Sequence, residues 1–534
     1  MEGKKMHEPL PPFPGVPQLH GRILIGGQIR GPHAAGGFKT KPVFSTCTRD
    51  EKPLLLGTTP QVGVEVLAEA VAAAADAWAK GLGEWPMARA EERIRAVAEF
   101  RDAMKAEREV VCRLLMWEIG KNWIDAQGEF DRTIQYIDDT ITEVRNLDRD
   151  SSRFQFAGGI MAQIRRAPLG VTLCMGPFNY PLNETFATLV PALIMGNSAV
   201  VKIPRYGQLI WEPLLEAFQK SFPPGVVNIV NGRGREIVGP VVRQGNVDVL
   251  AFIGTSEVAN QIKISHPKPS RFRSILSLEA KNPAIVMADA DLDNAVSECV
   301  RGALSFNGQR CTALKIIFVD KKIAADFTRR LVERVDALVC GLPWEADVSI
   351  TPLPDAQKPA YLRGLIEDAV AKGAVLANPG RGGRVEGALF YPAVLSRVPA
   401  GARVAIEEQF GPVVPIREFE DVQEVKDYVI ASPYGNQASL FGRDPQQMGA
   451  MIDYLSNQVC RINVNAQCQR GPDVYPFTGR KNSAEGTLSV FDALRSFSIR
   501  CMVAAKQDLA GNRTMQDILH GGSSRFPPPD AVPS

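Results

Sequence analysis

The sequence predicts an α/β fold built on a doubly wound parallel sheet, followed by a second α/β domain. Five short apolar runs start mostly about 25 residues apart, which is the length of one βα unit. They begin at Gly170, Ser198, Val226, Val247 and Pro283. The runs lack polar alternation, which is typical of strands buried on both faces. Helix-like segments fill the gaps between them, over residues 183–194, 209–221, 235–244 and 256–265.

The segments on either side of this sheet have their own patterns. The first 45 residues are rich in Gly and Pro and predict an extended segment over the surface. Ala-rich and amphipathic stretches predict helices from Val62 to Leu147. A helix pattern runs from Asp291 to Phe306, and a looser alternation of strands and helices follows it. That alternation indicates the second α/β domain.

The late segment RSFSIRCMVAA alternates polar and apolar residues like an exposed strand. An isolated edge strand seldom ends a monomer unprotected, so we expect it to pair across a subunit interface. The protein is therefore expected to form a homo-oligomer, either a dimer or a tetramer. Residues from Lys506 onward are expected to form a tail.

The composition excludes several classes of function. The chain has 61 basic and 59 acidic side chains, so its charge gives no case for nucleic acid or an anionic membrane surface. Only five histidines are present, and four of them lie in the first 33 residues or in the Pro-rich tail. The remaining one, His266, lies in a polar SHPKP loop and is expected to face solvent. We therefore expect no metal site and a chemistry without histidine.

Cysteine usage and hydropathy indicate the compartment. Nine cysteines without a CxxC pair do not make a disulfide scaffold or a zinc ribbon. The N-terminus lacks the apolar run of a signal peptide. The most apolar stretch, residues 186–201, is broken by Pro and Gly and does not predict a membrane span. We expect a reduced, cytoplasmic protein.

Two residues carry the expected chemistry. Cys311, in the run NGQRCTALK, has polar neighbours that make an unlikely core site, and Arg310 beside it could lower its pKa. Cys311 is therefore a candidate thiolate nucleophile. Asn179, in the turn GPFNYP that closes the first sheet strand, lies where the carboxyl ends of parallel strands line a ligand crevice. Its side-chain N–H can stabilise an oxyanion.

The motifs GPFNYP, VVKIP, FIGTSEV, GQRCT and EEQFGPV occur in the order and approximate spacing of the aldehyde dehydrogenase superfamily. The sequence resembles that superfamily over roughly residues 60–505, and most resembles its NADP-dependent non-phosphorylating glyceraldehyde-3-phosphate dehydrogenases. The resemblance implies a Rossmann-type domain over 46–150 and 165–285, with 1–45 as an N-terminal extended segment. It also implies a catalytic domain over 286–475, a small β oligomerisation element over 151–164 and 485–506, and a tail over 507–534.

The resemblance implies a role for each matching residue. Cys311 attacks the aldehyde and forms a thiohemiacetal, whose oxyanion Asn179 and the Cys311 backbone N–H hold. Hydride transfer to the nicotinamide leaves a thioester that water hydrolyses. Lys202 matches the lysine on the adenosine ribose, Thr255 the hydroxyl near the pyrophosphate, and Glu408 the carboxylate on the nicotinamide ribose. The other implied cofactor contacts are Phe178, Gly232, Gly254 and Phe410.

The expected cofactor is NADP. NAD sites commonly place a carboxylate on the ribose, whereas NADP sites place basic groups at the 2′-phosphate. Arg205 lies three residues after Lys202, where relatives that prefer NAD often carry Glu. Two cations at one strand end favour a phosphate dianion.

The expected substrate is a small phosphorylated aldehyde, glyceraldehyde 3-phosphate. The family's phosphate contacts match three arginines and a phenol, and Thr312 joins them as an implied substrate contact. Three guanidiniums that converge on one small site are hard to explain without an anion. The matching residues are Arg132, Tyr180, Arg310 and Arg470.

One motif departs from the family. The family's general base is a Glu located 34 positions before the Cys, where this chain has Ser277. Glu279 lies two residues further on, and in an extended strand that is the same face but about 6.6 Å displaced. Either a local adjustment of the backbone makes Glu279 the base, or another group activates the water.

Three functions remain open from the sequence. The first is irreversible oxidation of glyceraldehyde 3-phosphate to 3-phosphoglycerate without inorganic phosphate. The second is oxidation of another small anionic aldehyde or semialdehyde, with coenzyme A as a further option for the acyl acceptor. The third is a catalytically silent binding or structural protein, against which the intact GQRCT and FNYP motifs argue.

Overall fold

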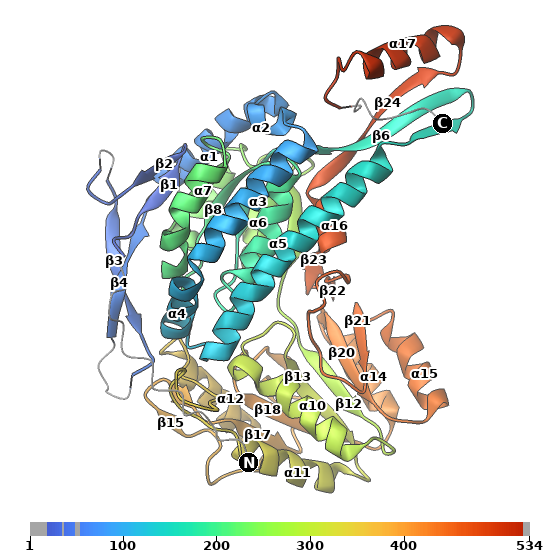
Figure 1. Ribbon diagram of the computed structural model, residues 1–534. Coiled ribbons are helices and arrows are strands. Elements are labelled where there is room, and N and C mark those ends of the chain that lie inside the picture. The colour runs from blue at the N-terminus through green and yellow to red at the C-terminus, as the bar shows by residue number, and fades with distance from the viewer. Residues whose placement is uncertain (1–18, 35–36, 49–53, 527–534) are drawn as a thin grey trace, which may run out of the picture.

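The first large sheet has eight strands, and its five central strands are parallel. The computed structural model describes residues 19–34, 37–48 and 54–526. Figure 1 shows this sheet in the upper body of the molecule. Strands β7 to β11 run parallel. Strand β1 joins them antiparallel on one side, with β2 antiparallel to it at the edge, and β23 joins antiparallel at the other edge. The order is β2 (Gln28–Arg30), β1 (Ile23–Ile25), β9 (Val227–Val230), β8 (Ser198–Lys202), β7 (Val171–Met175), β10 (Val249–Ile253), β11 (Arg273–Ser277) and β23 (Ala484–Glu485).

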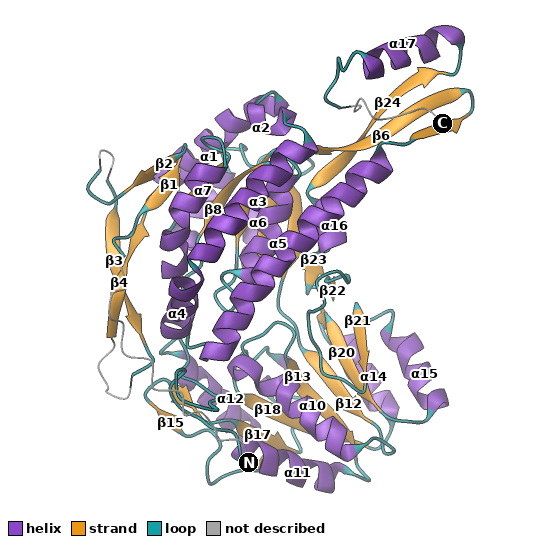
Figure 2. Cartoon of the chain, in the orientation of Figure 1, coloured by secondary structure: helices purple, strands orange, loops and turns teal. Residues whose placement is uncertain are grey.

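Helices bury both faces of this sheet, and Figure 2 shows several of them lying across one face. Buried side chains of one set of helices pack with one face: α1 (Val64–Trp78), α8 (Gly234–Val242) and α9 (Ser256–Ser265). A second set packs with the other face: α3 (Ala90–Ala106), α4 (Arg108–Ile119), α5 (Trp123–Ser151), α6 (Asn183–Ile194) and α7 (Leu215–Ser221). The predicted doubly wound α/β fold is confirmed, and the bounds of α6 and α9 are those that the sequence predicts.

The second sheet has seven strands, and helices again lie on both faces. Its order is β14 (Val375–Leu376), β17 (Ala393–Ser396), β18 (Val413–Phe419), β13 (Leu314–Asp320), β12 (Asn282–Val286), β20 (Gln437–Phe441) and β21 (Arg461–Val464). All neighbours except β14 and β17 run parallel. The covering helices are α10 (Leu292–Leu304) and α11 (Ala324–Asp336) on one face, and α12 (Lys358–Ala371), α14 (Val422–Ala431) and α15 (Pro445–Leu455) on the other.

A three-stranded arm projects away from both sheets (Figure 1). Its central strand β6 (Ile160–Pro168) lies between β5 (Phe154–Ala157) and β24 (Ser498–Lys506). The predicted late strand β24 is thus paired with β6 within the chain, over nine residue pairs. Only its free edge remains for pairing with a second subunit. Large apolar side chains are exposed on the arm, namely Phe156, Ile160, Ile499 and Met502.

The prediction assigned the fifth strand to the wrong sheet. Strand β11, in the polar run SRFRSILSL, was not predicted, and it is the last parallel strand of the first sheet. The predicted strand at Pro283 is β12, which lies in the second sheet. The crossover between the two sheets therefore falls between Ser277 and Asn282, ahead of the expected boundary at residue 285.

The two ends of the described chain also differ from expectation. Strand β1 does not lie over the surface: Ile23, Leu24 and Ile25 are buried, and β1 extends the first sheet. Strands β3 (Lys39–Ser45) and β4 (Leu54–Gln61) form a separate antiparallel pair. Part of the expected tail is helix α17 (Leu509–His520) on the arm. Among the described helices, none has the length and apolarity needed to cross a membrane.

Candidate active site

Cys311 lies in a turn between the 3-10 helix η3 (Ser305–Gly308) and strand β13. Phe306 and Asn307 have positive φ angles of 49° and 56° there, an unusual backbone conformation for residues other than glycine. The Asn307 side chain stabilises this conformation, because it donates to Thr351 Oγ1 at 3.0 Å and accepts from the Thr351 N–H at 2.9 Å. The strained turn presents Cys311 half-buried at its end.

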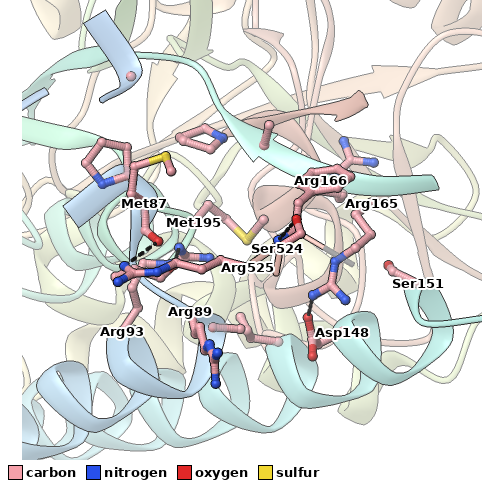
Figure 3. A pocket seen from close by; sticks show the side chains of 18 of the residues that line it. Met87, Arg89, Arg93, Asp148, Ser151, Arg165, Arg166, Met195, Ser524 and Arg525 are labelled. Atoms are coloured by element: carbon pink, nitrogen blue, oxygen red, sulfur yellow. Dashed lines mark hydrogen bonds and ion pairs between the residues drawn. The ribbon is translucent and has the colours of Figure 1, made fainter. Parts of the chain in front are cut away.

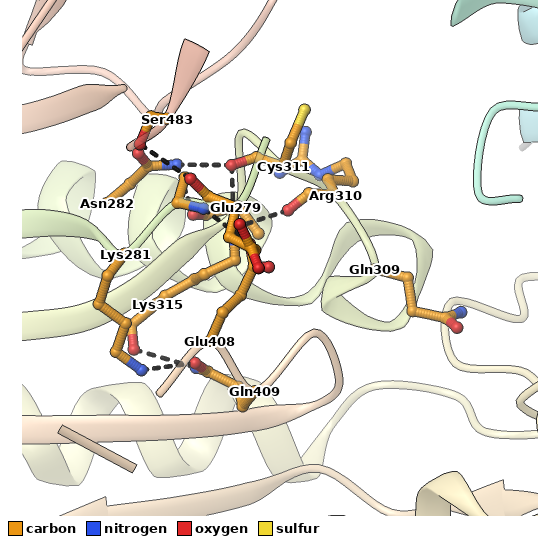
Figure 4. Close-up of polar contacts among 12 residues, drawn as sticks. Glu279, Lys281, Asn282, Gln309, Arg310, Cys311, Lys315, Glu408, Gln409 and Ser483 are labelled. Carbon is orange, nitrogen blue, oxygen red and sulfur yellow. Dashed lines mark hydrogen bonds and ion pairs between the residues drawn. The ribbon is translucent and has the colours of Figure 1, made fainter. Parts of the chain in front are cut away.

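Two side chains fix the backbone of Cys311 (Figure 4). Asn282 Nδ2 donates to the Cys311 carbonyl at 2.8 Å. Lys315 Nζ donates to the carbonyls of Arg310 and Cys311, both at 2.9 Å. These bonds use only the carbonyls and leave the Cys311 backbone N–H unengaged by them, and the Thr312 backbone acts on the thiol. Lys315 was part of the predicted GQRCTALK run, but no role was assigned to it.

The thiol of Cys311 does not have the lowered pKa that the sequence suggested. Burial raises the pKa, and the charges of Lys315 and Arg310 oppose this rise only in part. Glu408 raises it further. The neighbouring cations are present as expected, but desolvation of the thiolate outweighs them.

Asn179 lies beside the cysteine turn. The loop after strand β7 brings its side chain there, and Nδ2 donates to the Gln309 carbonyl at 2.8 Å. Asn179 is buried, and one Nδ2–H remains for a second acceptor. The structure thus brings the two predicted residues Asn179 and Cys311 together from different sheets.

Glu408 is bound to the same turn. Its Oε1 atom lies 2.9 Å from Lys315 Nζ and accepts from the Ala280 N–H at 3.1 Å. Two residues on, Phe410 has a φ angle of 44°, and its ring lies 5.8 Å from that of Phe178. The two predicted nicotinamide contacts, Glu408 and Phe410, therefore lie next to the predicted nucleophile.

Glu279 is not in an extended strand. Strand β11 ends at Ser277, which is buried, and Glu279 lies in the crossover segment before β12. Its Oε2 atom accepts from the Ser256 N–H at 2.8 Å, at the N-terminus of helix α9. A carboxylate is favoured there by the helix dipole and the free N–H groups. The displacement of 6.6 Å deduced for a strand does not apply.

Basic side chains surround Lys202 at the end of strand β8. Lys202 is buried, and burial together with the charge of Lys41 lowers its pKa to about 8. Lys41, on strand β3, itself has a lowered pKa through burial and the charges of Arg205 and Arg233. Sequence reasoning missed Lys41, because nothing in the first segment marks it as close to β8.

The glycines and Thr255 have structural explanations. A Cβ atom at Gly232 would lie 2.7 Å from the Val62 carbonyl oxygen, and one at Gly254 would lie 2.4 Å from the Phe252 ring. Both positions therefore need glycine for packing alone. Thr255 is the N-cap of helix α9, and its Oγ1 accepts from the Val258 N–H at 3.4 Å. As an acceptor in this cap, the hydroxyl can still donate its own hydrogen.

Two of the three predicted substrate arginines are paired with carboxylates. Arg132 forms two hydrogen bonds of 2.8 Å with Asp473. Arg470 is fully buried and pairs with Asp473 at 3.1 Å and with Glu184. The convergence of Arg132 and Arg470 is therefore explained by carboxylates of the protein itself, which the sequence reasoning did not consider. Arg470 Nη2 is nevertheless buried and has no hydrogen-bond partner among the described residues.

Arg310 differs from the other two arginines. Its Nη2 donates to the Gly302 carbonyl at 2.9 Å, at the end of helix α10, and its buried Nε has no hydrogen-bond partner. Within the described part of the chain, no carboxylate forms an ion pair with it. Burial raises the pKa of the Tyr180 phenol, and the positive charges of Arg310 and Arg132 oppose this rise. Thr312 is buried beside Cys311.

The burial of two further groups was not predicted, one near this site and one away from it. Lys121 Nζ pairs with Glu129 and lies 3.5 Å from the centre of the Tyr180 ring. His266, expected at the surface, is buried: its Nε2 lies 3.1 Å from the Val247 carbonyl oxygen, and its ring stacks on Phe272. Within the described residues, no cluster of His, Cys, Asp and Glu could hold a metal ion.

In this site, the turn that carries Cys311 lies beside Asn179, which follows the end of strand β7. Comparisons with known proteins agree with this arrangement. The aldehyde dehydrogenase family matches residues 41–501, and the chain belongs to this family. An NADP-dependent glyceraldehyde-3-phosphate dehydrogenase from Streptococcus equinus is 33% identical over 472 residues, which cover 87% of this chain and 94% of the relative. Malonate-semialdehyde dehydrogenase 1 from Geobacillus kaustophilus (strain HTA426) is 28% identical over 490 residues, with 91% and 97% covered.

A solved structure gives the same picture. The NADP-dependent glyceraldehyde-3-phosphate dehydrogenase from Bacillus halodurans C-125, complexed with NADP, superimposes with a TM-score of 0.83 at 31% identity. The match covers 92% of this chain and all of that one. The predicted superfamily and its fold are confirmed.

Proposed function

We propose that this protein oxidises glyceraldehyde 3-phosphate to 3-phosphoglycerate with NADP, without inorganic phosphate. The observation that carries the substrate assignment is Arg310. Its guanidinium lies beside Cys311 (Figure 4) and interacts electrostatically with Asp125, but no carboxylate among the described residues forms an ion pair with it, and its buried Nε has no acceptor among them. A buried donor without a partner is costly, and a substrate phosphate removes that cost. The relatives named above act on the same substrate by name.

The chain's own residues supply each step of the reaction. The Cys311 thiol first loses its proton to solvent water, and the resulting thiolate adds to the aldehyde carbon. The remaining Nδ2–H of Asn179 and the Cys311 backbone N–H hold the oxyanion that forms. NADP, when bound, accepts the hydride from that carbon. The acyl group then remains on Cys311 as a thioester. Glu279 takes a proton from the water that attacks the thioester, and Cys311 leaves as the thiolate.

The residues present fit NADP. The carboxylate of Glu279 at the N-terminus of α9 shows that this end attracts an anion, and the pyrophosphate is the anion that the family places near Thr255. Burial is the main cause of the lowered pKa values of both lysines, and charge repulsion adds to it: Lys41 lowers the pKa of Lys202, and Arg205 lowers that of Lys41. A 2′-phosphate among them removes this repulsion. A pyrophosphate at this end would compete with Glu279 for the Ser256 N–H, and Glu279 would then be free to act as the base.

Arg205→Glu is expected to reverse the cofactor preference. Arg205 is exposed, and its guanidinium lies 5.0 Å from the centre of the Tyr206 ring. A lost charge-assisted bond lowers kcat/KM for NADP about 10- to 100-fold, and the new carboxylate accepts the 2′-hydroxyl of NAD. Steady-state kinetics with both cofactors measures the ratio. Arg243→Glu, an exposed change at the end of α8, is the matched control. An unchanged ratio in Arg205→Glu contradicts the assignment.

Arg310→Gln is expected to raise KM for glyceraldehyde 3-phosphate by about 10- to 100-fold and to leave KM for glyceraldehyde nearly unchanged. Arg310 is preferable to Arg470, because removal of Arg470 leaves Glu184 buried without its partner and endangers the fold. Arg301→Gln, an exposed change on the same helix end, is the control. Equal losses with both aldehydes refute the phosphate role.

A second substrate has support in one observation. The relative from Geobacillus kaustophilus is named for malonate semialdehyde, and the guanidinium of Arg310 can bind a carboxylate as well as a phosphate. The same kinetic series, extended to malonate semialdehyde with and without coenzyme A, decides between the two. A higher kcat/KM for the semialdehyde replaces our assignment.

We also propose the division of the chain and its assembly. The first sheet with its helices binds the cofactor, the second sheet carries the nucleophile, and the arm forms the interface of a homo-oligomer in the cytoplasm. The exposed Phe156, Ile499 and Met502 on the arm support this interface. Sedimentation of the intact chain distinguishes a dimer from a tetramer.

A further inference from the structure

A cavity of about 630 Å³ lies at the base of the arm, and Figure 3 shows side chains that line it. The loop before helix α3, the end of helix α5 and the end of strand β6 form its walls. The segment Ser523–Phe526, which follows α17, closes another side, where Arg525 Nη1 donates to the Met87 carbonyl at 3.3 Å. None of the predicted catalytic, cofactor or substrate residues lines this cavity.

The charge of the cavity is strongly positive. Among the described residues, its lining contains a single carboxylate, Asp148, and five arginines, namely Arg89, Arg93, Arg165, Arg166 and Arg525. These arginines come from three separate parts of the chain. Like charges gathered in one cavity repel one another, so the cluster is costly without an anion among them.

Two of the arginines are held in place by the protein and cannot turn away. Arg93 is buried and donates to the Ile194 carbonyl at 2.8 Å, and burial lowers its pKa to about 10. Arg166 donates to Ser498 Oγ at 2.7 Å. Both guanidiniums are therefore fixed at the wall of the cavity.

Arg165 supplies a donor without a partner. Its Nη2 pairs with Asp148, whereas Nη1 is buried and has no hydrogen-bond acceptor among the described residues. Arg89 is exposed at the rim and has no ion-pair partner within the described chain. Asp148 thus neutralises one of the five arginines. The unpaired N–H groups of Arg165 and Arg89 can donate to an anionic group.

The rest of the lining suits an organic molecule rather than a bare ion. Trp78, Pro86 and Met195 provide an apolar wall, and Ser151 and Ser524 provide hydroxyls. The volume is in the range of about 300–1,000 Å³ that is typical of small-molecule sites. We propose that this cavity binds a small organic phosphate, with its phosphoryl group on Arg165 and Arg89 and its carbon skeleton against Trp78.

Calorimetric titration of the full-length enzyme with fructose 1,6-bisphosphate tests the proposal. NADP is present at saturation, so that the cofactor site is filled. We expect a Kd in the micromolar range for the wild type. Arg165→Gln is expected to weaken binding at least tenfold. Arg149→Gln, an exposed change next to Asp148 on α5 but outside the lining of the cavity, is expected to change it less than twofold. Because loss of Arg165 also unpairs Asp148, Arg89→Gln serves as a second variant and is expected to weaken binding at least threefold.

Every outcome of the titration either supports or overturns the proposed site. Tenfold weaker binding of inorganic phosphate and of citrate supports an organic phosphate. Citrate bound as tightly as the bisphosphate overturns the phosphate assignment, and inorganic phosphate bound as tightly overturns the role of the carbon skeleton. No binding to the wild type, or equal binding to the wild type and both cavity variants, overturns the site. The aldehyde kinetics of Arg310→Gln report on the proposed reaction separately.

Discussion

Cys311→Ala is expected to lose aldehyde oxidation by a factor on the order of 10⁴ or more. The turn at Phe306 and Asn307 and the bonds of Asn282 and Lys315 serve to present this one thiol. Without the thiol, neither the thiohemiacetal nor the thioester can form. The measurement is NADPH absorbance at saturating aldehyde and cofactor, together with the melting temperature to show that the variant is folded.

Cys460→Ala is the matched control for the nucleophile, because Cys460 is an exposed free thiol. We expect it to retain full activity. The pKa of Cys311 provides a second check. Burial raises it, so alkylation of the free wild-type enzyme by iodoacetamide should still accelerate with pH above the ordinary thiol pKa of about 8.5. Substantial activity in Cys311→Ala contradicts covalent catalysis at this residue.

Glu279→Gln is expected to separate hydride transfer from hydrolysis. If Glu279 activates the water, the variant still forms the thioester but cannot release it. The expected result is a burst of about one NADPH per active subunit, followed by a steady state about 10²- to 10³-fold below that of the wild type. Rapid-quench mass spectrometry should detect the acyl group on Cys311.

Two further carboxylate variants make this experiment decisive. Glu257→Gln, on the exposed side of the same helix α9, should behave like the wild type. Glu408→Gln matters more, because Glu408 is the carboxylate that acts on the pKa of Cys311. A burst in Glu408→Gln together with normal turnover in Glu279→Gln contradicts our assignment of the base.

The sequence was informative where a pattern is local. Helices α6 and α9 have the predicted bounds, because apolar periodicity and caps such as Thr255 act within one element. Strand β11 was missed because its run carries arginines and serines. It also lies near the edge of the sheet, where only the short strand β23 follows it. The placement of β12 in the second sheet depends on partners far along the chain, which no local pattern encodes.

The sequence predicted which residues form the site, but it did not predict their ion pairs or the directions of their pKa shifts. Cys311, Asn179 and Glu408 do lie together. The carboxylates that neutralise Arg132 and Arg470 could not be identified, since Glu184 and Asp473 look like surface residues in the sequence. The state of Glu279 also depends on a contact with α9, which lies 23 positions earlier in the chain. Burial, which raises the pKa of Cys311, is a property of the whole fold.

The most direct test of the proposed reaction is its product balance. The purified enzyme is mixed with glyceraldehyde 3-phosphate and NADP in a buffer that contains neither inorganic phosphate nor coenzyme A. We expect one 3-phosphoglycerate for each NADPH, at a rate that added phosphate or coenzyme A does not change. Turnover that requires inorganic phosphate or coenzyme A contradicts hydrolytic oxidation of a phosphorylated aldehyde at Cys311. The absence of turnover with this substrate under all of these conditions contradicts it as well.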